Sequence, residues 1–244
     1  ELKADEDAVY DEELNIDLSE IVPMAACPHS PDNVKTVAEI GELKIDQVCI
    51  GSCTNSSFVD MMKVAHILKG KTIHPDVSLS IAPGSKQVLN MLAQNGALSD
   101  MIDAGARILE SACGPCIGMG QSPNSKGVSL RTFNRNFEGR SGTKYGQIYL
   151  VSPELAAASA LTGYLTDPRT LGDMPEFKLP EQFVINDNMV TAIQDKTQET
   201  YKIKPEKTKD EEGNIIPSDI GTFNNSYFNY VAAFGAFTPV SYVT

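Results

Sequence analysis

The 244-residue sequence lacks tryptophan, has only three histidines and contains no long hydrophobic run. Because a membrane-spanning helix needs about 20 consecutive apolar residues, we expect no transmembrane segment, and we recognise no secretory signal at the start. Basic residues are also scarce: 20 lysines and arginines face 32 acidic residues, so the formal net charge is -12. This charge argues against nucleic acid as a partner, since phosphate contacts require lysine and arginine.

The acidic charge is concentrated at the start of the chain. Residues 1–20 hold nine acidic residues and a single lysine, which is typical of a solvated arm rather than a binding tail. A regular alternation of apolar and amphipathic stretches follows and fades near residue 172. We therefore predict an acidic N-terminal segment (1–20), one α/β domain (21–172), and an irregular linker and tail (173–244) without an assigned role.

Strand and helix patterns alternate along the predicted domain. Short β-branched runs that end in glycine or polar residues predict five strands, within residues 44–53, 77–85, 106–114, 127–134 and 147–154. Helical spacing of apolar residues, with N-cap residues ahead and glycine behind, predicts four helices, within residues 58–70, 86–96, 97–105 and 154–165. This alternation predicts a three-layer α/β/α fold with a mostly parallel sheet.

The chain has five cysteines, which is an odd number: Cys27, Cys49, Cys53, Cys113 and Cys116. A chain of this length does not need disulfides to fold, so reduced thiols in a cytoplasmic protein are the best interpretation. We interpret Cys27 and Cys49 as structural. Cys49 lies inside a predicted strand, where a thiol behaves as a small apolar side chain.

The other three cysteines are expected to meet at one edge of the sheet. In a doubly wound fold, ligands bind beyond the carboxyl ends of the parallel strands. Cys53 directly follows the first predicted strand, and the segment Cys113 to Cys116 follows the third. Although Cys53 and Cys113 are far apart in the sequence, these strand ends bring them to the same edge.

Two cysteines separated by two residues can bind zinc, cycle as a redox disulfide or hold part of an iron–sulfur cluster. Structural zinc prefers four protein ligands, and His29, His66 and His74 are interpreted as ordinary loop or surface residues. A thioredoxin-like disulfide needs no third cysteine. Three thiolates suit a [4Fe–4S] cluster in which one iron stays incompletely ligated and can act as a Lewis acid.

The turn NRNFEGR follows the fourth predicted strand at the same edge. Its guanidinium groups, Arg135 and Arg140, suit bidentate capture of carboxylates. Asn134 and Asn136 can hydrogen-bond a substrate hydroxyl or a cluster sulfide. Beside three thiolates, this turn indicates an iron–sulfur site that acts on a small polycarboxylate, because electron transfer alone requires neither the arginines nor an open iron.

The segments IGSCTNSS, SACGPCIG and NRNFEGRSG occur in an order that resembles the aconitase superfamily. The resemblance extends over about residues 10–190. Within the superfamily, GPCIG and SPDNVKTV look like aconitate hydratase rather than its isopropylmalate or homoaconitate relatives.

This resemblance implies that Cys53, Cys113 and Cys116 ligate a [4Fe–4S] cluster. It implies that Asn134, Arg135 and Arg140 bind the substrate, with the two arginines on its carboxylates. The implied reaction is a hydro-lyase step of the tricarboxylic acid cycle, citrate to isocitrate through cis-aconitate, in a monomeric cytoplasmic enzyme.

The resemblance also implies that much of the enzyme is missing from this sequence. The acid and base groups of the family lie in other domains, and no GDNITTDHI-like stretch follows the predicted linker. We therefore expect no catalytic residue here beyond the cluster, negligible activity in isolation, and the missing domains as partners. The alternatives are an isopropylmalate or homoaconitate dehydratase relative, a zinc-stabilised domain, and an RNA-binding module without catalysis.

Overall fold

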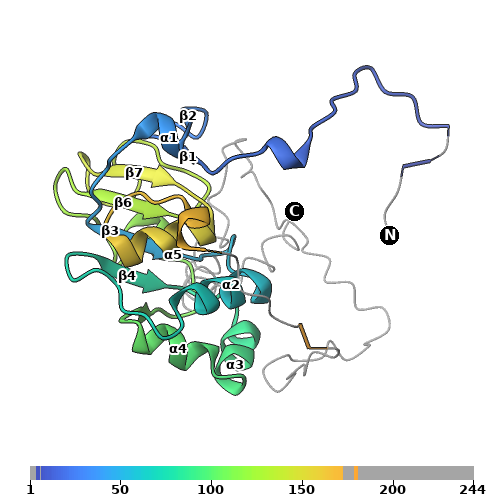
Figure 1. Cartoon of the computed structure of the whole chain (residues 1–244). Coiled ribbons are helices and arrows are strands. Elements are labelled where there is room, and N and C mark those ends of the chain that lie inside the picture. Colours follow the sequence, from blue (N-terminus) through green and yellow to red (C-terminus); the bar gives the residue numbers. More distant parts are fainter. Residues whose placement is uncertain (1–3, 6, 173–178, 181–244) are drawn as a thin grey trace, which may run out of the picture.

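The computed structural model describes residues 4–5, 7–172 and 179–180. Its centre is a seven-stranded sheet with the strand order β2-β1-β7-β6-β3-β4-β5 (Figure 1). The strands are β1 Met24–Ala26, β2 Val34–Thr36, β3 Gln47–Ile50, β4 Ser78–Ile81, β5 Arg107–Ile108, β6 Val128–Arg131 and β7 Gln147–Leu150. The helices are α1 Val37–Ile40, α2 Phe58–Leu68, α3 Lys86–Gln94, α4 Ala97–Asp103 and α5 Pro153–Thr162, with short 3-10 helices η1 Leu18–Glu20, η2 Pro115–Ile117 and η3 Pro168–Leu171.

Five neighbouring strands run parallel, and this direction positions the site. β3 pairs in parallel with β4 and β6, β4 pairs with β5, and β6 pairs with β7. Among the described strands, β1 alone runs opposite to the others, and it pairs antiparallel with β2 and with β7. The segments that follow β3, β5 and β6 therefore leave the sheet at the same edge.

The two faces of the sheet differ in chemistry because successive side chains of a strand point to opposite faces. One face is apolar and belongs to the core that the helices cover, through Val48, Ile50, Leu79, Ile81 and Leu130. α2 and α5 lie side by side over this face, and α3 and α4 lie beyond them at the β4 end (Figure 1). The residues between those apolar positions form a buried polar row on the other face: Gln47, Cys49, Ser80, Ser129 and Arg131.

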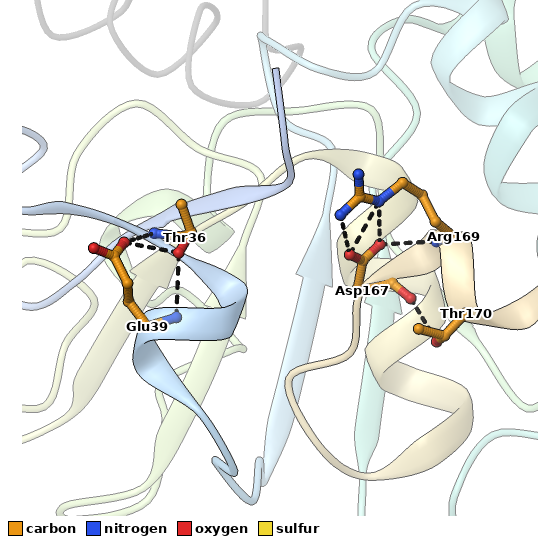
Figure 2. A network of polar contacts seen from close by, with 5 residues as sticks. All are labelled: Thr36, Glu39, Asp167, Arg169 and Thr170. Atoms are coloured by element: carbon orange, nitrogen blue, oxygen red, sulfur yellow. Dashed lines mark hydrogen bonds and ion pairs between the residues drawn. The ribbon is translucent and has the colours of Figure 1, made fainter. Parts of the chain in front are cut away.

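Local capping explains where the helices begin. Ser57 and Asp60 form a capping box at the start of α2, and Thr36 and Glu39 form one at the start of α1. Figure 2 shows the second box, in which Glu39 Oε2 accepts hydrogen bonds from both the backbone N–H and the hydroxyl of Thr36. The same figure shows Asp167 at the N-terminus of η3, where it pairs with Arg169.

The predicted fold class is confirmed, and so are the five predicted strands and four predicted helices. On the polar face the covering layer comes from the segment with η2, because Arg131 bonds to carbonyls of that segment. β1, β2 and α1 were not predicted, since each is only three or four residues long and has no buried apolar run.

The described residues from 4 to 20 are all exposed, and Figure 1 shows this segment extending away from the sheet. The predicted linker and tail lie almost wholly outside the described residues, and the predicted domain boundaries stay predictions. In the part of the chain that the structure describes, no helix is long and apolar enough to cross a membrane.

Candidate cluster and substrate site

The turn after β3 carries Cys53 and lies between residues that follow the neighbouring strands, Thr132 after β6 and Ala82 after β4. Gly51 N donates to Thr132 Oγ1 at 2.8 Å, and the side chain of Asn55 donates to Thr132 O at 2.7 Å. Gly51 has a φ of +82°, and a Cβ at this position would lie 2.2 Å from Ala82 O. Glycine is therefore required where the turn crosses the end of β4, and the turn leaves the Cys53 thiol exposed.

The second turn, Cys113 to Gln121, is the cysteine loop. Its Sγ atoms, on Cys113 and Cys116, are 3.8 Å apart, and both cysteines are half-buried and free of disulfides. η2 begins between them at Pro115 and contains Cys116. Gly118 ends η2 with a φ of +86°, and a Cβ there would lie 2.2 Å from Ser141 O. The cysteine loop therefore packs directly against the segment that follows Arg140.

The groups that affect the Cys113 thiol include other predicted site residues. Burial, the charge of Cys116, a hydrogen bond with Cys116 and the charge of Cys53 raise the pKa of Cys113 to about 11, while the charge of Arg140 opposes them. The structure thus brings Cys53, Cys113, Cys116 and Arg140 within interaction range, although they come from three separate turns. The predicted meeting of the three thiols at one edge agrees with this geometry.

Asn134 and Arg135 lie at the same edge and are both exposed. Asn134 Oδ1 accepts a hydrogen bond from Thr54 Oγ1 at 2.9 Å, which joins the turn after β6 to the turn of Cys53. Among the described residues, no hydrogen bond or ion pair draws the Arg135 side chain toward the thiols. Its place in the site depends on its position in the turn alone.

The prediction for Asn136 is wrong. This side chain is fully buried, and its Nδ2 donates to Cys27 O at 2.8 Å and to Ile148 O at 3.1 Å. It therefore ties the turn to β7 and to the end of β1, and it is not available to a substrate or a cluster sulfide.

Sequence reasoning missed Arg131. Its guanidinium is fully buried under the cysteine loop, where Nη1 donates to Pro115 O at 2.6 Å. The signal was visible, because an arginine inside the otherwise apolar strand GVSLRTF needs buried acceptors. The acceptors themselves, Pro115 O and Gln121 O, were not predictable from the strand, because they belong to a separate loop.

Two further cysteines and two histidines make contacts of their own. Cys27 and Cys49 are buried, and burial raises the pKa of both thiols, in agreement with a structural role. His66 Nδ1 is 2.8 Å from Met62 O within α2, and His74 accepts from the backbone of Asp76 in a loop.

The donor set fits an iron–sulfur cluster better than a single metal ion. In the described ranges, no three His, Cys, Asp or Glu side chains converge as they would around one ion. Each cysteine of a cubane binds a different iron, so the thiolates need not converge on one point. The hydroxyls of Ser111 and Ser141 are buried and have no hydrogen-bond partner among the described residues. Both hydroxyls are therefore able to form a further hydrogen bond close to the cysteine loop.

Comparison with known proteins places these motifs in a family. A sequence model of the Aconitase family (aconitate hydratase) matches residues 35–163. The 3-isopropylmalate dehydratase large subunit of Moorella thermoacetica is 45% identical over 167 residues, which is 68% of this chain and 40% of that protein. The corresponding subunit of Caldanaerobacter subterraneus is 46% identical over 165 residues (67% and 40%), and large subunit 2 of Archaeoglobus fulgidus is 42% identical over 170 residues (69% and 41%).

These relatives change the expected substrate. They are named for 3-isopropylmalate, so the preference for aconitate hydratase and the tricarboxylic acid cycle finds no support in them. The chain spans about 40% of the length of the curated relatives that it matches.

Proposed function

Because this chain belongs to the aconitase family, we propose that it is the cluster-binding segment of a hydro-lyase that removes water from 3-isopropylmalate. The observation that carries the proposal is the group of three free thiols from two separate turns, Cys53 with Cys113 and Cys116. Cys116 lies 3.8 Å from Cys113 between the Sγ atoms, and the charges of Cys53 and Arg140 also act on Cys113. The identity of 42 to 46% to large subunits named for that substrate supports this choice over citrate.

Cys53, Cys113 and Cys116 would hold a [4Fe–4S] cluster. When bound, this group supplies an iron with a free coordination position that acts as a Lewis acid toward the substrate hydroxyl. The positive charge of Arg140 favours the thiolate form of Cys113, which is the form that binds metal.

The exposed turn after β6 would bind the substrate. Arg135 and Arg140 present planar guanidinium groups that match two carboxylates. Thr54 orients Asn134 by donating to its Oδ1, and the Nδ2 amide would donate to a substrate oxygen. The turn itself is anchored by buried Asn136, so the arginines start from a fixed backbone.

The proposed enzyme is an assembly rather than the monomer expected from the sequence. The relatives are named as large subunits, and this chain spans about 40% of their length. We propose that acid and base groups come from segments and a further subunit outside this chain, which is inactive alone. The five free cysteines support a cytoplasmic location.

Anaerobic reconstitution of the 244-residue chain with iron and sulfide tests the cluster. We expect about four irons and about four acid-labile sulfides per chain, with the visible absorption of a cluster. Stoichiometric zinc without sulfide would assign the thiols to a structural metal site and end the proposal.

Substrate choice is tested on the reconstituted chain by titrating 3-isopropylmalate and citrate against the visible spectrum. We expect 3-isopropylmalate to act at lower concentration, whereas tighter binding of citrate would favour aconitate hydratase. Arg140→Lys should weaken binding because an ammonium cannot reproduce the fork of a guanidinium. Arg107→Lys, at an exposed position of β5, is the matched control.

A further inference from the structure

Arg131 is a buried cation at the carboxyl end of β6. It donates from Nε to Ser129 Oγ at 3.0 Å, from Nη2 to Gln47 Oε1 at 2.9 Å, and from Nη1 to Pro115 O at 2.6 Å. A further short hydrogen bond runs from Nη2 to Gln121 O. The sheet therefore holds the guanidinium through Nε and Nη2, and the guanidinium holds the cysteine loop through Nη1 and Nη2.

The two carbonyls that Arg131 binds lie on either side of Cys116 in the sequence. Pro115 lies between the two cysteines, and Gln121 lies at the far end of the loop. Pro115 O also accepts from Gly118 N at 3.0 Å, which closes η2. A single planar group thus fixes both ends of the segment that contains Cys116.

The charge of Arg131 has no carboxylate partner. No Asp or Glu of residues 4–5, 7–172 or 179–180 forms an ion pair with it. Burial lowers the pKa of Arg131, and the charges of Cys49 and Cys116 oppose that shift. A buried cation is costly unless hydrogen bonds satisfy it, and the acceptors of Arg131 are Ser129 Oγ, Gln47 Oε1 and the loop carbonyls of Pro115 and Gln121.

We propose that Arg131 is the positioning residue that holds the cysteine loop in its cluster-binding shape. This inference rests on the proposed function, because the shape matters only if Cys113 and Cys116 ligate a cluster. Arg131 touches neither substrate nor thiol sulfur. It acts through the backbone carbonyls of Pro115 and Gln121 in the loop.

The test compares two substitutions with a matched control in the 244-residue chain. Arg131→Met removes every donor and the charge, and Arg131→Lys keeps a charge but cannot bridge two carbonyls and the sheet at once. Ser129→Ala is the control, because it breaks the same buried network on the sheet side and leaves the contacts to the loop intact. If Arg131→Met does not fold, Arg131→Lys carries the comparison.

Two readouts separate positioning from general stability. Amide hydrogen exchange is followed at Gly118, Met119 and Gln121, which are hydrogen-bonded within the loop, and at the amides of β4 as a reference. Iron, sulfide and the visible spectrum are measured after anaerobic reconstitution. We expect loop exchange to rise by about tenfold or more relative to β4 in both Arg131 variants, and iron and sulfide to fall by about half or more.

The control should match the unsubstituted chain in both readouts. Equal acceleration of the loop and β4, or a full complement of iron and sulfide in a folded Arg131→Met variant, would overturn the inference. If the unsubstituted chain takes up no iron and sulfide, the proposed function fails, whereas the exchange comparison still decides whether Arg131 holds the loop.

Discussion

Thr54 Oγ1 donates to Asn134 Oδ1 at 2.9 Å, which joins two turns 80 positions apart in the chain. Thr54 follows Cys53, and Asn134 precedes Arg135. This one contact therefore links the turn of the third thiol to the turn of the arginines. It holds the turn of a proposed cluster ligand beside the turn of the arginines proposed to bind carboxylates.

Cys53→Ser should reduce iron and sulfide after reconstitution by about half or more, because two thiolates do not hold a cubane firmly. Cys27→Ser is the control, since Cys27 is buried near β1 and should leave the metal content unchanged. The measurement is iron and acid-labile sulfide per chain. Normal iron and sulfide in Cys53→Ser would remove this residue from the ligand set.

Gly118→Ala should destabilise the chain by about 3 kcal/mol, because an alanine there combines a positive φ with a contact of 2.2 Å to Ser141 O. Gly120→Ala, where φ is +67° and nothing lies within 4 Å, should cost only about 1 kcal/mol. Chemical denaturation of both variants measures the difference. Equal costs would show that the cysteine loop does not pack tightly against the segment after Arg140.

Asn136→Ala should lower the free energy of unfolding by about 2 kcal/mol, because it leaves the buried carbonyls of Cys27 and Ile148 without a donor. Asn134→Ala, at an exposed position, should change it by less than about 0.5 kcal/mol. Urea denaturation distinguishes the two. A larger loss of unfolding free energy in Asn134→Ala than in Asn136→Ala would contradict the structural role assigned to Asn136.

The thiols should differ in their reaction with iodoacetamide. The pKa of Cys113 is raised to about 11, so at pH 8 this thiol is almost wholly protonated and reacts slowly, while exposed Cys53 reacts first. The rate at Cys113 should rise about tenfold per pH unit from pH 8 to 10, as the thiolate fraction rises. Peptide mass spectrometry follows each site, and a rate at Cys113 that is independent of pH would contradict the assignment.

The ion pair between Lys63 and Glu154, 2.7 Å long, joins α2 to α5. Burial by itself raises the pKa of Glu154. The hydrogen bond and the charge of Lys63 act in the opposite direction, and the net pKa lies below its ordinary value of 4.5. Its contribution to stability is therefore complete above pH 4.5 and is lost as the pH falls through the folded-state pKa.

Glu154→Gln should consequently cost about 1 kcal/mol at pH 7, and the difference from the unsubstituted chain should fade toward pH 3. Thermal unfolding across this range measures it. Asp76→Asn, which breaks the exposed pair with Lys44, is the control and should not change the unfolding midpoint measurably. A Glu154→Gln difference that grows on acidification would contradict the lowered pKa of Glu154.

Local sequence patterns were enough to predict the alternation of strands and helices, the parallel direction of five strands and the edge where three cysteines meet. These features depend on short-range periodicity, on capping residues such as Ser57, and on the geometry of parallel strands. The antiparallel pair β1 and β2 was not predicted, because such short strands have no periodic sequence signal and form only where a sheet edge is available to pair with them.

The roles of individual polar residues, in contrast, depend on the tertiary structure. Asn134 and Asn136 are the same residue type in one turn, yet one faces solvent and the other is fully buried between β1 and β7. Arg131 is part of a strand pattern, but its acceptors Pro115 O and Gln121 O come from a loop that reaches it only in the folded chain. The physical reason is that a buried donor takes its acceptors from whatever segment packs over it, and a local sequence pattern does not contain that segment.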